Sequence, residues 1–262
     1  MLRGQPGQDF TVQQPQLVEP DTDVFDINIP NPGKYKTDFA NTKVANIVNL
    51  YPDTQANILW DYYYSQDENW WDTVIHPDPY FDYPERSSFE DYYHMYLTKD
   101  DDPSIPERLR YMYEANDVGP HSFTYYYKRT TNFHPYLQMF STPKFMQLLE
   151  FITGHENLQW DPALTFVSNY SKGHYNGPHT DGINGRIAFV YHMSRNWKPI
   201  DGGLFMRMDW DYKTVNKVVV PPYNTLTIFD TSGGVSGGSP HLVSEVAQSC
   251  DNKRISFTGW YI

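Results

Sequence analysis

The chain has 262 residues, 39% of them hydrophobic, so it is long enough to bury a substantial core within one principal domain. Its 20 basic and 32 acidic residues give a net charge of −12, which repels nucleic-acid backbones and anionic membranes, so we expect neither as a partner. One cysteine excludes an intrachain disulfide, and no apolar run has the length of a membrane span or the form of a signal-peptide core. These features together favour a cytoplasmic protein.

Residues 1–40 are rich in Gln, Pro, Asp and Asn and contain few large apolar side chains. Such a composition buries too little apolar surface to offset the entropy lost on ordering, so we expect an extended or partly disordered arm. We expect residues 41–262 to form a single domain. Within it, 41–160 is predicted to be a helical, aromatic-rich support region and 161–262 a β-sheet core.

Two helices are predicted in the support region. Near Asp53, a capping residue precedes an apolar pattern that suits a helix through Tyr64. Further on, Ser141 and Thr142 supply a cap, Pro143 occupies the first turn, and Gly154 ends a second helix. We expect both helices to pack against the sheet.

Aromatic and acidic residues alternate between positions 62 and 127, with rings clustered at 62–64, 70–71, 92–93 and 125–127. Large rings of this kind ordinarily fill the space between helices and a sheet. The alternative is that some of them line a cleft for an extended peptide, because aromatic surfaces recognise proline-containing segments. The sequence leaves both interpretations open.

About eight β-strands are predicted after residue 120, from runs rich in β-branched and aromatic residues. These runs include 123–127, 164–170, 187–193, 204–208, 218–220, 225–229 and 253–261. Turn residues separate several of them, notably the glycines at 202–203 and the PPYN stretch at 221–224. Because strands and helices do not alternate, the pattern favours a mainly β jelly roll with flanking helices over a doubly wound sheet.

His179 and Asp181 are separated by one residue in the stretch YNGPHTDG. In an extended segment, side chains at i and i+2 point to the same face, so this imidazole and this carboxylate can bind one cation. A third ligand would complete the two-histidine, one-carboxylate set that suits non-haem Fe(II) and leaves coordination positions open. A bare His-x-Asp pair is usually only a polar turn, so the surrounding pattern has to support it.

The order of motifs along the chain supplies that support. After the pair come Gly202–Gly203–Leu204, then PPYNTLTIF, then His241, and finally RISFTGWY from Arg254. Over residues 140–262 this order resembles the prolyl-hydroxylase-like Fe(II)/2-oxoglutarate-dependent oxygenases, and it is most similar to the branch that hydroxylates a proline of a ribosomal protein. The resemblance implies that the core is a double-stranded β-helix, or jelly roll.

The resemblance also implies a binding role for four side chains. His179, Asp181 and His241 would bind Fe(II), and Arg254 would bind the 5-carboxylate of 2-oxoglutarate. The planar guanidinium of an arginine matches a carboxylate, and inside a barrel it would be a costly buried charge without an anion. An exposed arginine in the last strand is the ordinary alternative.

Other side chains near the motif are weaker candidates. By resemblance, Tyr170 is a hydroxyl donor to 2-oxoglutarate, although a core tyrosine fits the position nearly as well. Arg186 and Trp197 are candidates for contact with the substrate. His174 and His192 match no ligand position of the family and are interpreted as residues that pack around the site.

The resemblance therefore implies a 2-oxoglutarate-dependent dioxygenase of the prolyl 4-hydroxylase type, which uses Fe(II) and O₂, with ascorbate as an accessory. Its substrate would be a prolyl residue of a peptide or protein, and it would release succinate and CO₂. The alternatives are a hydroxylase of a free amino acid or small metabolite, and a non-catalytic jelly-roll binding module. Fold alone does not separate them, but three metal ligands together with Arg254 favour an enzyme.

Overall fold

The computed structural model describes residues 27, 29–76, 123–128, 135–181, 185–209, 214–232 and 240–262. Most of the predicted N-terminal arm and of the aromatic-rich stretch lie outside these residues. The described helices are α1 (Pro32–Thr42), α2 (Asp53–Tyr64) and α5 (Pro143–Thr153), and 3-10 segments cover Glu68–Trp70, Pro135–Ser141 and Pro199–Asp201. In the part of the chain that is described, no helix has the length and apolar character needed to cross a membrane.

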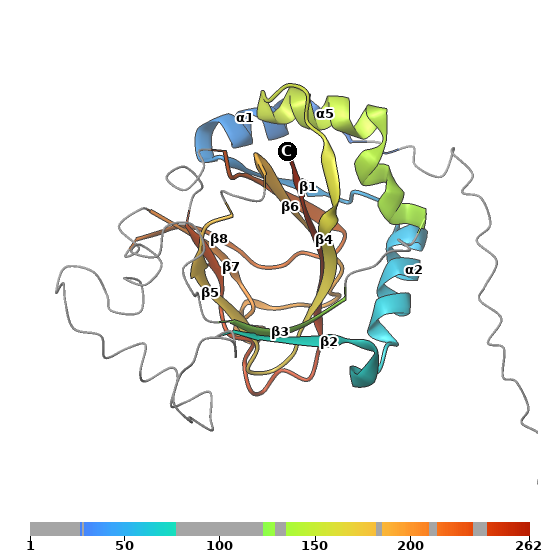
Figure 1. Cartoon of the computed structure of the whole chain (residues 1–262), viewed down its shortest axis with the longest axis vertical. Coiled ribbons are helices and arrows are strands. Elements are labelled where there is room, and N and C mark those ends of the chain that lie inside the picture. The colour runs from blue at the N-terminus through green and yellow to red at the C-terminus, as the bar shows by residue number, and fades with distance from the viewer. Residues whose placement is uncertain are drawn as a thin grey trace, which may run out of the picture.

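The strands contain more of the described residues than the helices do (Figure 1). They are β1 (Val44–Val48), β2 (Asp72–His76), β3 (Phe123–Lys128), β4 (Trp160–Tyr170), β5 (Tyr175–His179), β6 (Ile187–His192), β7 (Phe205–Met208), β8 (Val215–Val219), β9 (Thr225–Asp230), β10 (His241–Val243) and β11 (Arg254–Tyr261). All their pairings are antiparallel, as the absence of a strand–helix alternation predicted.

The sheet order explains how two facing halves of the sheet form. Strands follow one another as β1-β9-β6-β11-β4-β3-β5-β10-β7-β8, and β2 pairs with β3. Strand β3 joins the two halves, because β5 pairs with its residues 123–124 and β4 with its residues 126–128, while β2 pairs along its other edge. The halves β1-β9-β6-β11-β4 and β5-β10-β7-β8 face each other across the interior (Figure 1). The fold is therefore a jelly roll, as predicted.

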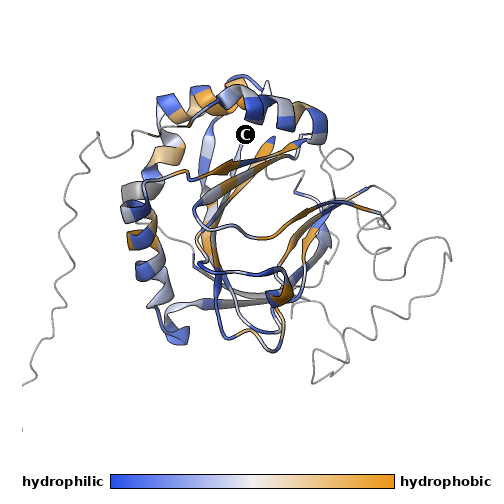
Figure 2. Ribbon diagram, turned by 180° about the vertical axis from the view of Figure 1, so that it is seen from behind, coloured by the Kyte–Doolittle hydropathy of each residue, from blue (hydrophilic) through white to orange (hydrophobic). Residues whose placement is uncertain are grey.

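The helices cover one outer face of this barrel, and strand alternation decides which side chains meet them. In β11, Ile255, Phe257 and Tyr261 join the core that includes Phe39 of α1 and Leu149 of α5. The alternate residues of β11 face the barrel interior instead. Figure 2 shows hydrophobic colour along the central strands and mixed colour on the helices, as expected for elements with one buried side.

The predicted helices in the support region are confirmed. Helix α5 is capped by Thr142, whose Oγ1 accepts a hydrogen bond from the Phe145 backbone nitrogen at 3.3 Å, and it ends at Gly154 with φ 75°. Helix α2 covers the predicted residues, but the capping role expected near Asp53 is wrong. The cap position belongs to Pro52 and has no side-chain hydrogen bond, and Asp53 lies in the first turn.

The predicted extended arm to residue 40 is wrong in its last part, because α1 begins at Pro32. Tyr35 and Phe39 of this helix are buried in the core, which provides the apolar surface that the composition of the region as a whole did not suggest. Strands β1 and β2 lie in the region predicted as helical, and β5 was not among the predicted strand runs. All three are only five residues long, too short for a clear periodic signal.

Candidate active site

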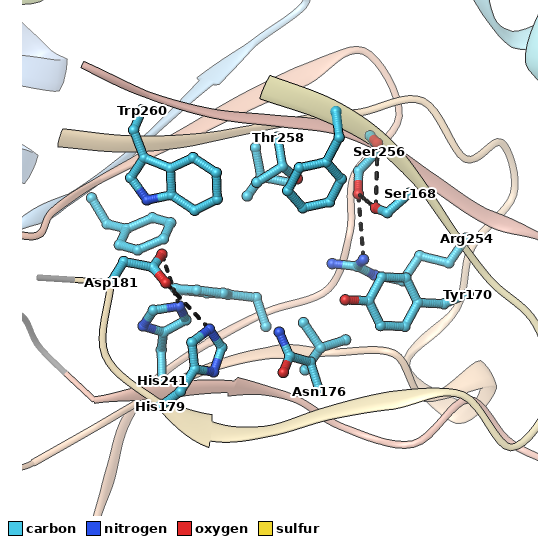
Figure 3. Close-up of a pocket in the computed structure, with 15 residues that line it drawn as sticks. Ser168, Tyr170, Asn176, His179, Asp181, His241, Arg254, Ser256, Thr258 and Trp260 are labelled. Atoms are coloured by element: carbon cyan, nitrogen blue, oxygen red, sulfur yellow. Dashed lines mark hydrogen bonds and ion pairs between the residues drawn. The ribbon is translucent and has the colours of Figure 1, made fainter. Parts of the chain in front are cut away.

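Two histidines and one aspartate meet inside the barrel. His179 ends β5, Asp181 follows two residues later, and His241 begins β10. Because β5 and β10 pair antiparallel, His241 lies directly opposite His179. The nearest carboxylate oxygens of Asp181 are 3.4 Å from Nε2 of each histidine (Figure 3). All three residues are buried, and their potential ligand atoms lie within 4.8 Å of one another.

The protonation of this cluster suits a metal cation. Nδ1 of His179 lies 2.8 Å from the Gly177 carbonyl oxygen, and because a carbonyl only accepts, Nδ1 carries the hydrogen. Nε2 faces Asp181, and in the neutral imidazole that metal binding requires it is the nitrogen with the lone pair. Burial alone would raise the pKa of Asp181, but His241 and His179 beside it hold that pKa well below its usual range. Two imidazole nitrogens and one carboxylate match the ligands that non-haem Fe(II) accepts.

Arg254 lies farther along the same cavity. It is 2% exposed, it lies opposite Tyr170 in the β11–β4 pairing, and its guanidinium is 4.9 Å from the Tyr170 ring. Nη1 donates a long hydrogen bond of 3.5 Å to Ser256 Oγ, Nε has no partner, and no acidic side chain among the described residues pairs with Arg254. Burial lowers the pKa of Arg254 to about 10, so the side chain is still a cation at neutral pH. Such a buried charge is stable only with an anion, which fits a keto acid with a distal carboxylate.

The two groups line one cavity of about 200 Å³. It is lined by Phe166, Ser168, Tyr170, Asn176, His179, Asp181, Val190, Phe205, Phe229, His241, Val243, Arg254, Ser256, Thr258 and Trp260. The rings of Phe205 and Phe229 contact His241, with centroids 5.5 and 4.8 Å away, and so restrict its orientation. A cavity of this size suits a small organic acid, and it spans the distance from the metal-ligand cluster to the arginine (Figure 3).

The glycine turn at 202–203 makes room for Arg254. A Cβ on Gly203, which has φ 60°, would lie 2.8 Å from the Arg254 Cδ and 3.2 Å from the Trp197 ring. Trp197 is buried here, and its Nε1 donates to the Gly202 carbonyl at 2.8 Å. The turn and Trp197 therefore form a support behind Arg254 that tolerates no additional side-chain atom.

The two candidates for substrate contact do not line the cavity. Trp197 lies behind Arg254, in the cluster with Val243 and Val246. Arg186 donates from its backbone nitrogen to the Tyr261 carbonyl and from its guanidinium to the Asn157 carbonyl at 3.4 Å. Contact of either residue with a substrate stays a prediction.

The two neighbouring histidines make packing and backbone contacts in the described part of the chain. His174 Nδ1 accepts from the Ser171 backbone nitrogen at 3.2 Å. His192 is buried, and its Nε2 lies 3.1 Å from Thr227 Oγ1, which itself donates to Asn46 Oδ1 at 2.8 Å. Because that hydroxyl proton is already used, His192 must donate from Nε2. Burial, with the Arg254 charge nearby, lowers the pKa of His192 well below its usual value.

Several polar side chains that line the cavity were not identified from the sequence: Ser168, Asn176, Ser256, Thr258 and Trp260. Strand alternation is the signal that could have found most of them. Every second residue of β11 from Arg254 shares the inward face, and Ser168 is two residues before Tyr170 in β4. Asn176 has no such signal, because it is placed only by the pairing of β5 with β10 and β3.

Comparisons with known proteins agree with this geometry. Residues 165–262 match the family model of the 2OG-Fe(II) oxygenase superfamily, and this segment contains both histidines, Asp181 and Arg254. No curated protein matches the chain in sequence. Members of the superfamily use Fe(II), 2-oxoglutarate and O₂.

Solved structures share the fold at low sequence identity. A prolyl-4-hydroxylase from Pseudomonas putida is 17% identical, with a TM-score of 0.52, over 88% of this chain and 99% of that chain. An oxidoreductase of the 2OG-Fe(II) oxygenase family from Burkholderia pseudomallei is 14% identical, with a TM-score of 0.53, over 90% and 93% of the two chains. SnoN, a non-heme alpha-ketoglutarate-dependent epimerase from nogalamycin biosynthesis, is 9% identical, with a TM-score of 0.52, over 88% and 82%. Residues 165–262 thus match the 2OG-Fe(II) oxygenase superfamily, and the described domain has the jelly-roll fold that the solved 2OG-Fe(II) oxygenase structures share.

Proposed function

We propose that the protein hydroxylates a prolyl residue of a peptide or protein and converts 2-oxoglutarate to succinate and CO₂ in the same turnover. The observation that carries this proposal is one cavity with a buried His–Asp–His cluster and a buried Arg254 that pairs with no acidic side chain of the described residues. The shared fold with the Pseudomonas putida prolyl-4-hydroxylase supports the choice of a prolyl substrate. Phe166, Val190 and Trp260 add an apolar lining that suits a hydrocarbon ring.

The three clustered residues are the proposed ligands of Fe(II). His179 and His241 offer imidazole nitrogens, and Asp181 offers a carboxylate that offsets one of the two positive charges. Bound Fe(II) supplies the redox chemistry for O₂ and open positions for the keto acid. The rings that pack on His241 and the carbonyl of Gly177 that accepts from His179 hold both imidazoles in orientation before metal binds.

Arg254 and Tyr170 are the proposed partners of the distal carboxylate of 2-oxoglutarate. The guanidinium offers parallel donors to the two carboxylate oxygens, and the Tyr170 hydroxyl adds a hydrogen bond beside it. Because both side chains are almost completely buried, few water molecules compete for the carboxylate. The keto acid would therefore be held at a defined distance from the metal ligands.

A hydroxylase of a free amino acid or small metabolite is the second candidate. SnoN, an enzyme of nogalamycin biosynthesis, has the same TM-score, 0.52, as the Pseudomonas putida prolyl-4-hydroxylase. This equal likeness favours keeping the second candidate. A binding module without catalysis fits less well, because it has no role for a buried arginine that lies in the same cavity as a metal-ligand cluster and has no acidic partner among the described residues.

The test combines cosubstrate turnover with product analysis. The purified protein is incubated in air with Fe(II), 2-oxoglutarate and either proline-containing peptides or free amino acids. We expect succinate that disappears when EDTA is added, and a gain of one oxygen on a peptidyl proline by mass spectrometry. Oxidation confined to free amino acids would support the second candidate. No metal-dependent succinate with any substrate would contradict both.

Gly203→Ala tests the support behind Arg254. We expect the dissociation constant for 2-oxoglutarate to rise by roughly tenfold or more, because the new methyl displaces the arginine from its position. Isothermal titration calorimetry with the Mn(II)-loaded protein under argon measures this constant.

Gly154→Ala is the matched control for Gly203→Ala. Gly154 also has positive φ, 75°, but no atom lies within 4 Å of its added Cβ. This control should lose about 1 kcal/mol of stability from the left-handed backbone and keep its affinity for 2-oxoglutarate. Equal affinity in both variants would contradict the close packing of Gly203 against a ligand-binding Arg254.

A further inference from the structure

Asn176 has no role in the function proposed above, yet its side chain lies inside the cavity. It belongs to β5, three residues before His179, and it lies between the metal-ligand cluster and Tyr170 (Figure 3). Strand β5 pairs it with Val243 of β10 and Phe123 of β3. Asn176 therefore lies between the two ends of the cavity, one of which holds the metal-ligand cluster and the other Arg254.

The carboxamide of Asn176 makes one hydrogen bond and leaves one buried atom unpaired. Its side chain hydrogen-bonds to the Tyr170 hydroxyl, and its Oδ1 is buried without a partner. The bond to Tyr170 therefore comes from Nδ2, which is a donor. The unpaired Oδ1 is an acceptor and binds no anion, so Nδ2 is the group of Asn176 that can.

Nδ2 carries two hydrogens, so one can be donated to the Tyr170 hydroxyl oxygen while the other is donated to an anion oxygen in the cavity. The Tyr170 hydroxyl then keeps its own hydrogen for the same anion. A carboxylate in place of the amide would supply acceptors only. The choice of asparagine therefore suits an anionic ligand.

We propose that Asn176 is a cosubstrate-binding residue that acts together with Tyr170 on the carboxylate held by Arg254. This inference rests on the proposed function, because it requires 2-oxoglutarate in this cavity. The contact of Arg254 with the Tyr170 ring, at 4.9 Å, brings the guanidinium, the phenol and the amide together on one anion. A donor set of one charged and two neutral groups selects a carboxylate over an apolar end group.

Two substitutions of Asn176 distinguish a role as hydrogen-bond donor from a role in packing. Asn176→Leu keeps the branched shape and the number of heavy side-chain atoms but removes the amide, and we expect it to raise the dissociation constant for 2-oxoglutarate about tenfold. Asn176→Asp keeps the shape and places a second negative charge beside the carboxylate, so we expect a loss of about 10-fold to 150-fold. Calorimetry with Mn(II) and 2-oxoglutarate under argon measures both variants, and the Mn(II) affinity should not change.

A double-mutant cycle with Tyr170→Phe tests the cooperation. If Asn176 acts together with the Tyr170 hydroxyl, Asn176→Leu should weaken 2-oxoglutarate binding less than threefold in the Tyr170→Phe background. Full additivity of the two substitutions would overturn the paired role. Asn169→Asp is the matched control, since Asn169 is also buried with an unpartnered Oδ1 but does not line the cavity. It should lower thermal stability and leave 2-oxoglutarate affinity unchanged.

The outcomes also separate this inference from the proposed function. If the parent protein and Arg254→Met bind 2-oxoglutarate equally, or neither binds it, the proposed function fails and the role of Asn176 fails with it. If Arg254→Met loses affinity while Asn176→Asp and Asn176→Leu retain it, only the inference about Asn176 is overturned.

Discussion

Replacing Arg254 by methionine is expected to abolish tight binding of 2-oxoglutarate while metal binding is retained. The parent guanidinium is buried and pairs with no carboxylate of the described residues, so the distal carboxylate of the cosubstrate is its proposed partner. Removing one partner of such a pair costs about 2 to 5 kcal/mol. This corresponds to a rise in the dissociation constant of roughly thirty-fold to several thousand-fold.

The thermal stability of Arg254→Met without ligand should not fall, although its affinity for 2-oxoglutarate does. Because the variant no longer buries an unpaired charge, its melting temperature without cosubstrate should equal or exceed that of the parent. Added 2-oxoglutarate should raise the melting temperature of the parent and leave that of the variant unchanged. Differential scanning calorimetry with Mn(II) present measures both effects.

Two further arginine variants make the result specific. Arg254→Lys should recover part of the affinity, because it restores a point charge without the two parallel donors. Arg195→Met is the matched control, since Arg195 is partly exposed and lies 3.6 Å from Asp61. Parent-like binding of 2-oxoglutarate by Arg254→Met would refute the carboxylate assignment and direct attention to Lys253.

Replacing Asp181 by alanine is expected to reduce succinate formation to the background of a metal-free reaction. Asp181 is the carboxylate of the cluster, and its oxygens lie 3.4 Å from each histidine. Without it, the two imidazoles, 4.2 Å apart, have no anion to offset the charge of a bound cation. Succinate quantification and titration with Fe(II) under argon should both show the loss.

The fold of Asp181→Ala should persist, because the substitution removes no part of the apolar core. Circular dichroism and the melting temperature without metal check this expectation. Asp251→Ala is the matched control, because Asp251 is an exposed aspartate that pairs with Lys172 at 2.7 Å. Turnover should be unchanged in the control. Parent-like succinate formation in Asp181→Ala would remove the basis for the iron assignment.

The sequence by itself determined the fold class and the main members of the cluster. Apolar runs separated by turn residues predicted most strands after residue 120, because the alternation of a strand is a local property of the chain. His179 and Asp181 could also be identified locally, because only one residue separates them in the chain. His241 and Arg254 were assigned from the order of motifs and the family they resemble, and the structure brings both into one cavity with the pair.

Only the tertiary structure decided which side chains join them. Asn176 and Ser168 lie in different strands, and their common cavity depends on β3 pairing with both β4 and β5. Trp197 was a candidate for substrate contact from its position in the chain, yet folding places it behind Arg254. Likewise, α1 forms within a polar stretch because Tyr35 and Phe39 meet a core built from distant strands. Burial depends on which segments meet in space, and a single sequence records that only through weak local preferences.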